Sequence, residues 1–228
     1  MSSCAQPGTV LPGEKIASAS CDVAARKTSW ATRAIVGFWV VAVCAGMLTL
    51  LRYSNSPGPN VTSPATWPVN TRILLDSNRP TLVMFAHPRC PCTQASLSEL
   101  ERLVSNCRGQ LSAQMWFVKP AGTDSDWTNS VLWRRAAAVP GVTVYCDDDG
   151  VECRRFHAET SGHTVLYDAR GNLLFQGGIT MSRGHEGDNP GRSAVESIVH
   201  RKLFTQVRTS VYGCSLLSTE SSPPQSPL

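Results

Sequence analysis

The longest apolar run in the 228-residue chain lies near its N-terminus. Residues 34–51, AIVGFWVVAVCAGMLTLL, contain no charged side chain, and Arg33 and Arg52 flank them. A helix that crosses a bilayer needs about 20 apolar residues, and arginines at its ends can extend the span by reaching the interface. A long helix in a soluble core would show a polar face, which this run lacks. The pattern therefore predicts a transmembrane helix over 34–52.

A cleaved signal peptide would show a similar run, but three features favour an anchor that stays in the chain. The segment before the run is long, the run exceeds the roughly 7–15 apolar residues of a signal peptide, and no small-x-small cleavage site follows. Four basic residues precede the span and only Arg52 follows closely; the four are Lys15, Arg26, Lys27 and Arg33. Because basic residues stay inside, we expect a single-pass protein of the inner (cytoplasmic) membrane with a cytoplasmic N-terminus and a periplasmic C-terminal domain.

The period of the pattern changes in residues 68–213, which we expect to form one globular domain. The run TLVMFA at 81–86 is typical of a buried parallel strand, and the segment 92–106 carries one apolar face at helical spacing. Further strands are predicted over 114–118, 142–146, 163–168 and 173–177, and further helices over 125–138, 151–159 and from Pro190, with Asn189 as N-cap. This order predicts an α/β fold with a mixed central sheet and helices on both faces.

Three segments have the composition of tails and linkers. Residues 1–33 are expected to form a disordered cytoplasmic tail, residues 53–67 a linker rich in Ser, Pro and Asn, and residues 214–228 a disordered C-terminal tail. The net charge of +4 is spread along the chain, which argues against a nucleic-acid partner. Membrane lipid is the expected non-protein partner.

The candidate chemistry lies at Cys90-Pro91-Cys92, between the strand at 81–86 and the helix that follows it. The free N–H groups and the dipole of a helix N-terminus stabilise a thiolate. With Pro91 at the first helical position, Cys90 would be the N-cap and the more exposed sulfur. We therefore predict Cys90 as the nucleophile and Cys92 as the resolving thiol, with His87 and Arg89 supplying positive charge.

The single-residue spacer affects the expected redox behaviour. Residues two apart near a helix start lie at Cα separations of roughly 5–6 Å, within the range of a disulfide, although the ring is small. A strained disulfide is more easily reduced. The pattern favours oxidase or isomerase-like exchange over strong reduction.

This order of elements, with cysteines at the first strand-to-helix junction, resembles the thioredoxin fold. The match is closer to membrane-anchored bacterial thioredoxin-like proteins named RedB, and it covers roughly residues 70–216. The residues that carry it are His87–Thr93, Leu166–Gly171, Gly177–Thr180, Arg183–Asn189 and Tyr212–Cys214. The resemblance implies a thioredoxin-like fold and disulfide exchange with exported thiol proteins, supported by a membrane or periplasmic redox partner.

The chain departs from ordinary thioredoxins at three positions. One residue instead of two separates the cysteines, His163 stands where thioredoxins have a cis-proline, and Met84 stands where they often have a buried aspartate. These differences leave the expected fold unchanged and weigh against ordinary dithiol reductase chemistry.

Two other functions fit the same residues. Thiolates and imidazole can hold Cu(I), so a copper-binding or copper-delivery protein would use Cys90 and Cys92 with His185 or His163; His87 is a further candidate. Copper-delivery proteins on the thioredoxin fold resemble this arrangement. The third possibility is a redox-inactive adaptor. Disulfide exchange itself requires no cofactor.

The chain has nine cysteines, an odd number, so at least one stays free or bonds elsewhere. We expect Cys107 to be a buried apolar residue of its helix. Cys146 and Cys153 flank a turn across which they could pair. Cys214 is a candidate third redox thiol that folds back onto the site.

Overall fold

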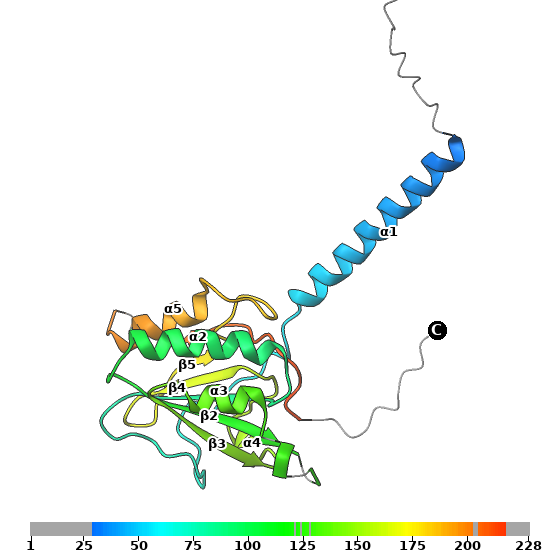
Figure 1. Cartoon of the computed structure of the whole chain (residues 1–228). Helices are drawn as coiled ribbons and strands as arrows, with labels where there is room; N and C mark the ends of the chain where they lie inside the picture. Colours follow the sequence, from blue (N-terminus) through cyan, green and yellow to red (C-terminus); the bar gives the residue numbers. More distant parts are fainter. Residues whose placement is uncertain (1–28, 121, 124, 128, 203–204, 218–228) are drawn as a thin grey trace, which may run out of the picture. The chain divides into compact units, whose positions relative to one another are not determined.

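The computed structural model describes residues 29–120, 122–123, 125–127, 129–202 and 205–217 (Figure 1). The predicted tails therefore lie outside the described residues, except for 29–33 and 214–217. Helix α1, Trp30–Ser54, is the one described helix long and apolar enough to cross a membrane. It extends beyond the predicted 34–52 at both ends. The chain divides into two compact units inside this helix, at Gly46 and Met47.

The second unit is built on a six-stranded mixed sheet. Its strands are β1 Thr81–Ala86, β2 Ser112–Lys119, β3 Val142–Asp148, β4 His163–Tyr167, β5 Leu173–Gly177 and β6 Val207–Arg208, in the order β3-β2-β1-β4-β5-β6. Strands β1, β2 and β3 are parallel, and β4 is antiparallel to both β1 and β5. This topology places β1 at the centre of the sheet, which is why all six of its residues are buried.

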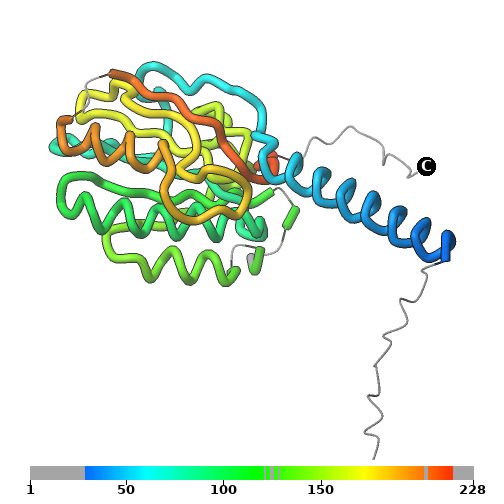
Figure 2. The backbone as a smooth tube through the Cα atoms, turned by 90° about the horizontal axis from the view of Figure 1, so that it is seen from above, coloured from blue at the N-terminus to red at the C-terminus, as the bar shows by residue number. Residues whose placement is uncertain are grey.

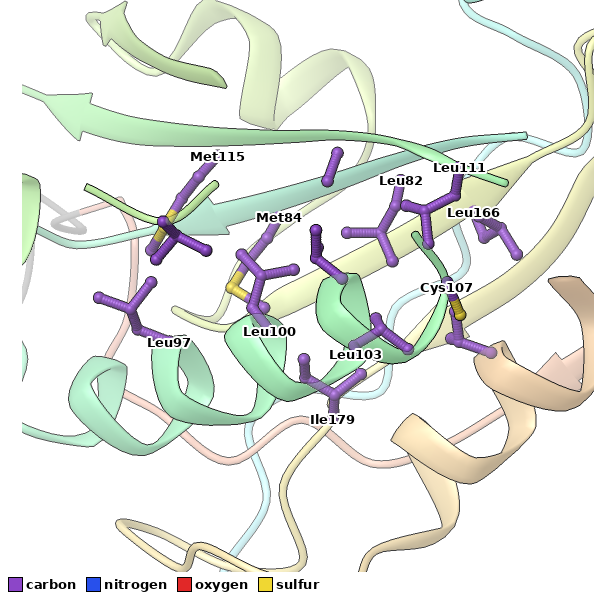
Figure 3. Packing of buried hydrophobic residues seen from close by; sticks show 14 of the residues in the cluster. Leu82, Met84, Leu97, Leu100, Leu103, Cys107, Leu111, Met115, Leu166 and Ile179 are labelled. Carbon is purple, nitrogen blue, oxygen red and sulfur yellow. The ribbon is translucent and has the colours of Figure 1, made fainter. Parts of the chain in front are cut away.

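Helices cover both faces of this sheet. They are α2 Cys92–Asn106, α3 Val131–Ala137, α4 Val151–Arg155 and α5 Pro190–Val199, with the short 3₁₀ helix η1 at Ser125–Trp127. Leu82 and Met84 of β1 pack with α2, α3 and α5 (Figure 3), whereas Val83 and Phe85 pack on the opposite face with α4. Figure 2 shows the course of the backbone through the domain. The predicted mixed sheet with helices on both faces is confirmed.

Two predicted helices are shorter in the structure. The segment 125–138 is split into η1 and α3 because the Ser130 hydroxyl accepts a hydrogen bond from the Trp133 N–H and starts a new helix there. Helix α4 ends at Arg155 instead of 159. His157, two residues later, has a left-handed backbone (φ 55°), which a helix cannot continue through.

The predicted linker 53–67 is largely part of the domain. Thr66 forms a bridge with Asn172, and the Leu173 N–H donates to the Ala65 carbonyl at 2.9 Å. The Trp67 ring makes edge contacts with the rings of Phe156 and Tyr167. These backbone bonds and the burial of aromatic surface outweigh the flexible composition of the segment.

The beginning of the predicted C-terminal tail is also ordered. Leu216 is only 1% exposed, and Ser215 bridges Thr160. The segment 213–216 therefore packs on the domain, because an apolar side chain and two backbone bonds fix it there.

Candidate functional site

Strand β1 carries the chain to the site, and α2 begins directly beyond it. The His87 N–H donates to the Ser161 hydroxyl at 2.9 Å, and that hydroxyl lies 2.7 Å from the Thr93 hydroxyl. The Cys90 N–H donates to the His87 carbonyl at 3.2 Å. Ser161 thus ties the end of β1 to the start of α2 and fixes the turn that carries Cys90.

Helix α2, Cys92–Asn106, has the predicted bounds. Pro91, directly before it, already has a helical backbone (φ −62°, ψ −30°), as predicted for a proline at the start of a helix. The Thr93 N–H donates to the Cys90 carbonyl at 3.1 Å and closes a tight first turn. Cys90 therefore contributes its carbonyl to the helix start and leaves its sulfur free for other contacts.

The prediction that Cys90 is the more exposed sulfur is wrong. Cys90 is only 2% exposed, whereas Cys92 is half-buried. The Sγ atoms of Cys90 and Cys214 lie 2.9 Å apart, although 124 positions separate the two residues in the sequence. The structure thus brings the candidate third thiol against Cys90.

Backbone contacts hold Cys214 in this place. The Ser161 N–H donates to the Cys214 carbonyl at 2.8 Å, and the Leu216 N–H donates to the Glu159 carbonyl at 2.8 Å. On the other side, the Arg183 guanidinium donates to the Gly213 carbonyl. The segment around Cys214 is therefore fixed to the same loop that orients the start of α2.

The two sulfurs in contact differ in acidity. Burial opposes ionisation of Cys90, but hydrogen bonding by Cys214 and Thr93 outweighs it and lowers the pKa of Cys90 below its ordinary value. Burial, together with the hydrogen bond to Cys90, raises the pKa of Cys214 to about 12. Of the two thiols, Cys90 therefore loses its proton more readily, and Cys214 keeps its proton.

Cys92 forms a cluster of three thiols with Cys90 and Cys214. Burial and the charge of Cys90 raise the pKa of Cys92, whereas Arg183 acts in the opposite direction. Arg183 also favours the ionised form of Cys214. Its role was missed in the sequence, because a single arginine in a glycine-rich loop gives no signal of what it faces.

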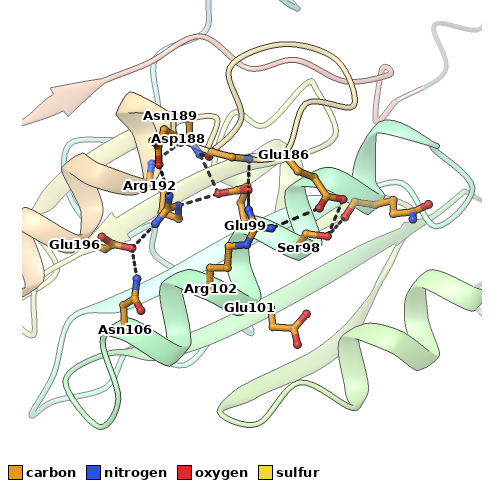
Figure 4. Close-up of polar contacts among 12 residues, drawn as sticks. Ser98, Glu99, Glu101, Arg102, Asn106, Glu186, Asp188, Asn189, Arg192 and Glu196 are labelled. Carbon is orange, nitrogen blue, oxygen red and sulfur yellow. Dashed lines mark hydrogen bonds and ion pairs between the residues drawn. The ribbon is translucent and has the colours of Figure 1, made fainter.

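A buried carboxylate holds the loop that carries Arg183. Glu99 of α2 is fully buried and accepts hydrogen bonds from the Gly187 N–H (2.8 Å), the Asn189 amide (3.0 Å) and Arg192 (2.8 Å), as Figure 4 shows. Arg102 adds a further contact at 2.7 Å. The network joins α2, the loop and the first turn of α5.

His87 and Arg89 do not have the predicted role. Burial and the nearby Arg89 lower the pKa of His87, and its Nδ1 accepts the Arg89 N–H at 3.1 Å, so the ring is neutral at neutral pH. The Arg89 guanidinium stacks 4.0 Å from the centre of the Trp127 ring. The groups that lower the pKa of Cys90 are instead Cys214 and Thr93.

The described residues contain no group of three or more His, Cys, Asp or Glu side chains that could hold a metal ion. His163 is buried, its Nε2 lies 2.9 Å from the Ser63 hydroxyl, and burial lowers its pKa to about 4. His185 is exposed. The predicted copper ligands, Cys90 and Cys92 with either histidine, therefore do not form a coordination site in this structure.

The remaining domain cysteines lie outside the cluster. Cys107 is buried in the core as predicted, and burial raises its pKa to about 11. Cys146 and Cys153 are free thiols with separate partners: the Cys146 thiol contacts Asp148 at 3.5 Å, and the Cys153 thiol contacts the Gly150 carbonyl at 3.2 Å.

No family model and no curated protein matches the chain. The chain is similar in structure to a hypothetical protein from Sinorhizobium meliloti, at 17% identity and a TM-score of 0.57, over 73% of this chain and 100% of that one. An uncharacterised conserved protein from Geobacillus kaustophilus matches at 15% identity and a TM-score of 0.53, over 74% and 95%. A secreted disulfide oxidoreductase from Mycobacterium tuberculosis matches at 16% identity and a TM-score of 0.40, over 56% and 84%. The order and directions of the strands, with α2 beginning directly beyond the central strand β1, show that the domain has a thioredoxin-like fold.

Proposed function

We propose that the protein is a membrane-anchored thiol-disulfide oxidoreductase that exchanges disulfides with exported proteins, with Cys90 as the nucleophile. The observation that carries the proposal is the state of Cys90: its pKa is lowered at the start of α2, and two more thiols lie beside it. A thiolate with a second thiol in reach is what disulfide exchange requires.

The reaction balances with the thiols of this chain alone. The Cys90 thiolate attacks one sulfur of a substrate disulfide, a mixed disulfide forms, and the other substrate sulfur leaves as a thiolate that takes up a proton. A second thiol of the site then loses its proton and attacks Cys90, which closes an internal disulfide and releases the second substrate thiol. Two electrons pass from the site to the substrate, and the reverse sequence oxidises a substrate dithiol.

A hollow beside Cys90 offers a place for the substrate chain. Its volume is about 260 Å³, and its lining residues are Pro88, Arg89, Cys90, Pro91, Gln94, Val131 and Leu132. Val131 is 72% exposed although it is apolar. Such a surface suits an extended polypeptide whose apolar side chain lies next to the reacting cysteine.

The proposed location follows from α1. This helix has 25 residues, a mean hydropathy of 2.4 over its best 18-residue window and no buried residue. As an uncleaved anchor with basic residues on its N-terminal side, it would place the domain in the periplasm. That compartment is oxidising, so thiols there need a partner that sets their redox state.

Refolding of a scrambled disulfide protein tests the proposal. The full chain in detergent should catalyse disulfide reshuffling, and Cys90→Ser should abolish the activity because the thiolate is gone. Cys146→Ser, which removes a free thiol outside the cluster, should leave the activity unchanged. Activity that survives in Cys90→Ser would refute the assignment of Cys90 as the nucleophile. An inactive wild-type chain would favour the alternative of a redox-inactive adaptor.

Copper binding by the same cysteines is the competing proposal. It predicts one equivalent of tightly bound Cu(I) per chain, and it predicts that Cys92→Ser loses this binding. Anaerobic titration with a Cu(I) chelator as competitor measures both. Wild-type affinity no greater than that of a chain without Cys90 and Cys92 would rule it out.

A further inference from the structure

We propose that Cys214, and not Cys92, is the thiol that resolves the mixed disulfide on Cys90, so that the oxidised protein carries a Cys90–Cys214 disulfide. This inference rests on the proposed exchange function and names the partner thiol of the same site. Cys92 stays a free thiol through the cycle.

The geometry favours this pair. The Cys90 and Cys214 sulfurs are 2.9 Å apart, and a disulfide bond is about 2.05 Å long, so less than about 1 Å of approach separates contact from bonding. A Cys90–Cys92 disulfide would instead close a small ring across the tight first turn of α2, where the Thr93 N–H already bonds the Cys90 carbonyl.

The fold presents Cys214 from a fixed segment. A Cβ atom at Gly213 would lie 2.0 Å from the Ser161 carbonyl oxygen, so only glycine allows the two backbones to pack this closely. Leu216 is buried on the other side of Cys214. The chain is therefore held both before and after the thiol, which keeps the Cys214 sulfur beside Cys90.

The charges of the site change during the reaction in a way that activates Cys214. In the reduced protein, burial and its contact with the Cys90 thiolate keep Cys214 protonated. Once Cys90 is bonded to the substrate, its charge is gone, whereas Arg183 still favours the ionised form of Cys214. Cys214 can then give up its proton and attack the Cys90 sulfur, and the substrate sulfur leaves with the bonding electron pair.

The reverse direction retraces the same steps. A substrate thiolate attacks the Cys90 sulfur of the Cys90–Cys214 disulfide, and Cys214 leaves as a thiolate that takes up a proton. The second substrate thiolate then attacks the first substrate sulfur, a substrate disulfide forms, and Cys90 leaves as a thiolate.

Peptide mapping of the oxidised full chain tests the pairing. Trypsin releases residues 90–102, which hold both Cys90 and Cys92, and residues 209–228, in which Cys214 is the one cysteine. After oxidation by glutathione disulfide and blocking of free thiols, we expect the two peptides to be linked, with one blocked thiol on 90–102. The link should persist in Cys92→Ser and disappear in Cys90→Ser. A disulfide inside 90–102, with Cys214 blocked, would overturn the inference.

Trapping separates this inference from the proposed function. With a disulfide-bonded substrate protein, Cys214→Ser should accumulate the mixed disulfide on Cys90, whereas Cys92→Ser and the control Cys146→Ser should not. Accumulation in Cys92→Ser alone would overturn the role of Cys214 and leave the exchange function standing. If the wild-type chain forms no adduct and reshuffles no substrate, the function fails, while peptide mapping still decides the pairing.

Discussion

At the scale of single residues, Cys90 shows how a buried thiol can be made acidic. Burial alone would favour the neutral thiol, yet hydrogen bonding by Cys214 and Thr93 reverses the effect. Thr93 belongs to the helix that follows Cys90, whereas Cys214 lies in the C-terminal segment. The reactivity of Cys90 therefore depends on the folded position of Cys214.

Replacing Cys214 should raise the pKa of Cys90. Cys214→Val removes the sulfur contact but keeps a side chain of similar bulk, so Cys90 stays buried and loses a hydrogen bond to its thiolate. In a Cys92→Ser background, the midpoint of the pH dependence of iodoacetamide alkylation on peptide 90–102 should move to higher pH. Cys146→Val in the same background should leave the midpoint in place. An unmoved or lower midpoint in Cys214→Val would show that the contact does not control the pKa.

His163 should make the domain less stable in acid. Its pKa is about 4 in the folded state against an ordinary 6.5, so between these values the unfolded chain binds more protons. The free energy of unfolding should fall as the pH drops from 6.5 to 4, by about 3 kcal/mol at most. Urea unfolding followed by tryptophan fluorescence measures this. His163→Gln should flatten the slope in this window, whereas His185→Gln, at an exposed position, should keep it.

At the scale of elements, local patterns located the parts of the site that follow one another in sequence. The apolar run of β1 and the helical face of α2 predicted both elements at their observed bounds, and with them the place of Cys90. The partners Cys214 and Arg183 come from distant segments whose packing depends on the finished sheet. No periodicity predicts β6, a two-residue strand. The composition of the segments around Thr66 and Leu216 predicted a linker and a disordered tail, but both segments pack on the domain. Backbone pairing with the domain, which composition does not reveal, holds them there.

The buried carboxylate of α2 should matter more to stability than its exposed neighbour. Glu99→Gln keeps the shape of the side chain but leaves Arg192, which is 13% exposed, without its buried charge partner. Removing one partner of a buried pair costs roughly 3–5 kcal/mol. Glu101→Gln removes a half-exposed charge 3.6 Å from Arg135 and should cost less than about 1 kcal/mol. Chemical unfolding of both variants gives the comparison, and equal losses would contradict the assignment of Glu99 as the central residue of the network.

At the scale of the whole molecule, the proposed chemistry depends on the membrane anchor predicted at α1. A cluster of three thiols in the reducing cytoplasm would stay reduced, whereas in an oxidising compartment it can cycle between two states. Whether a Cys90–Cys214 pair can cycle between its reduced and oxidised states therefore depends on the side of the membrane that the domain occupies. The basic residues around α1, and no feature of the domain, are the basis on which that side is predicted.

Thiol labelling in intact cells should reveal this orientation. A membrane-impermeant maleimide should label the half-buried Cys92 from outside, because the domain is expected in the periplasm, to which the reagent gains access through a permeabilised outer membrane. Cys4 and Cys21 precede the span and should be labelled only after the inner membrane is also opened. Single-cysteine variants that retain Cys92, Cys4 or Cys21 make the comparison direct, and their mass shows whether the N-terminal segment is kept. The reverse labelling pattern would place the domain in the cytoplasm, and the absence of Cys4 and Cys21 from a membrane-free mature chain would identify α1 as a cleaved signal.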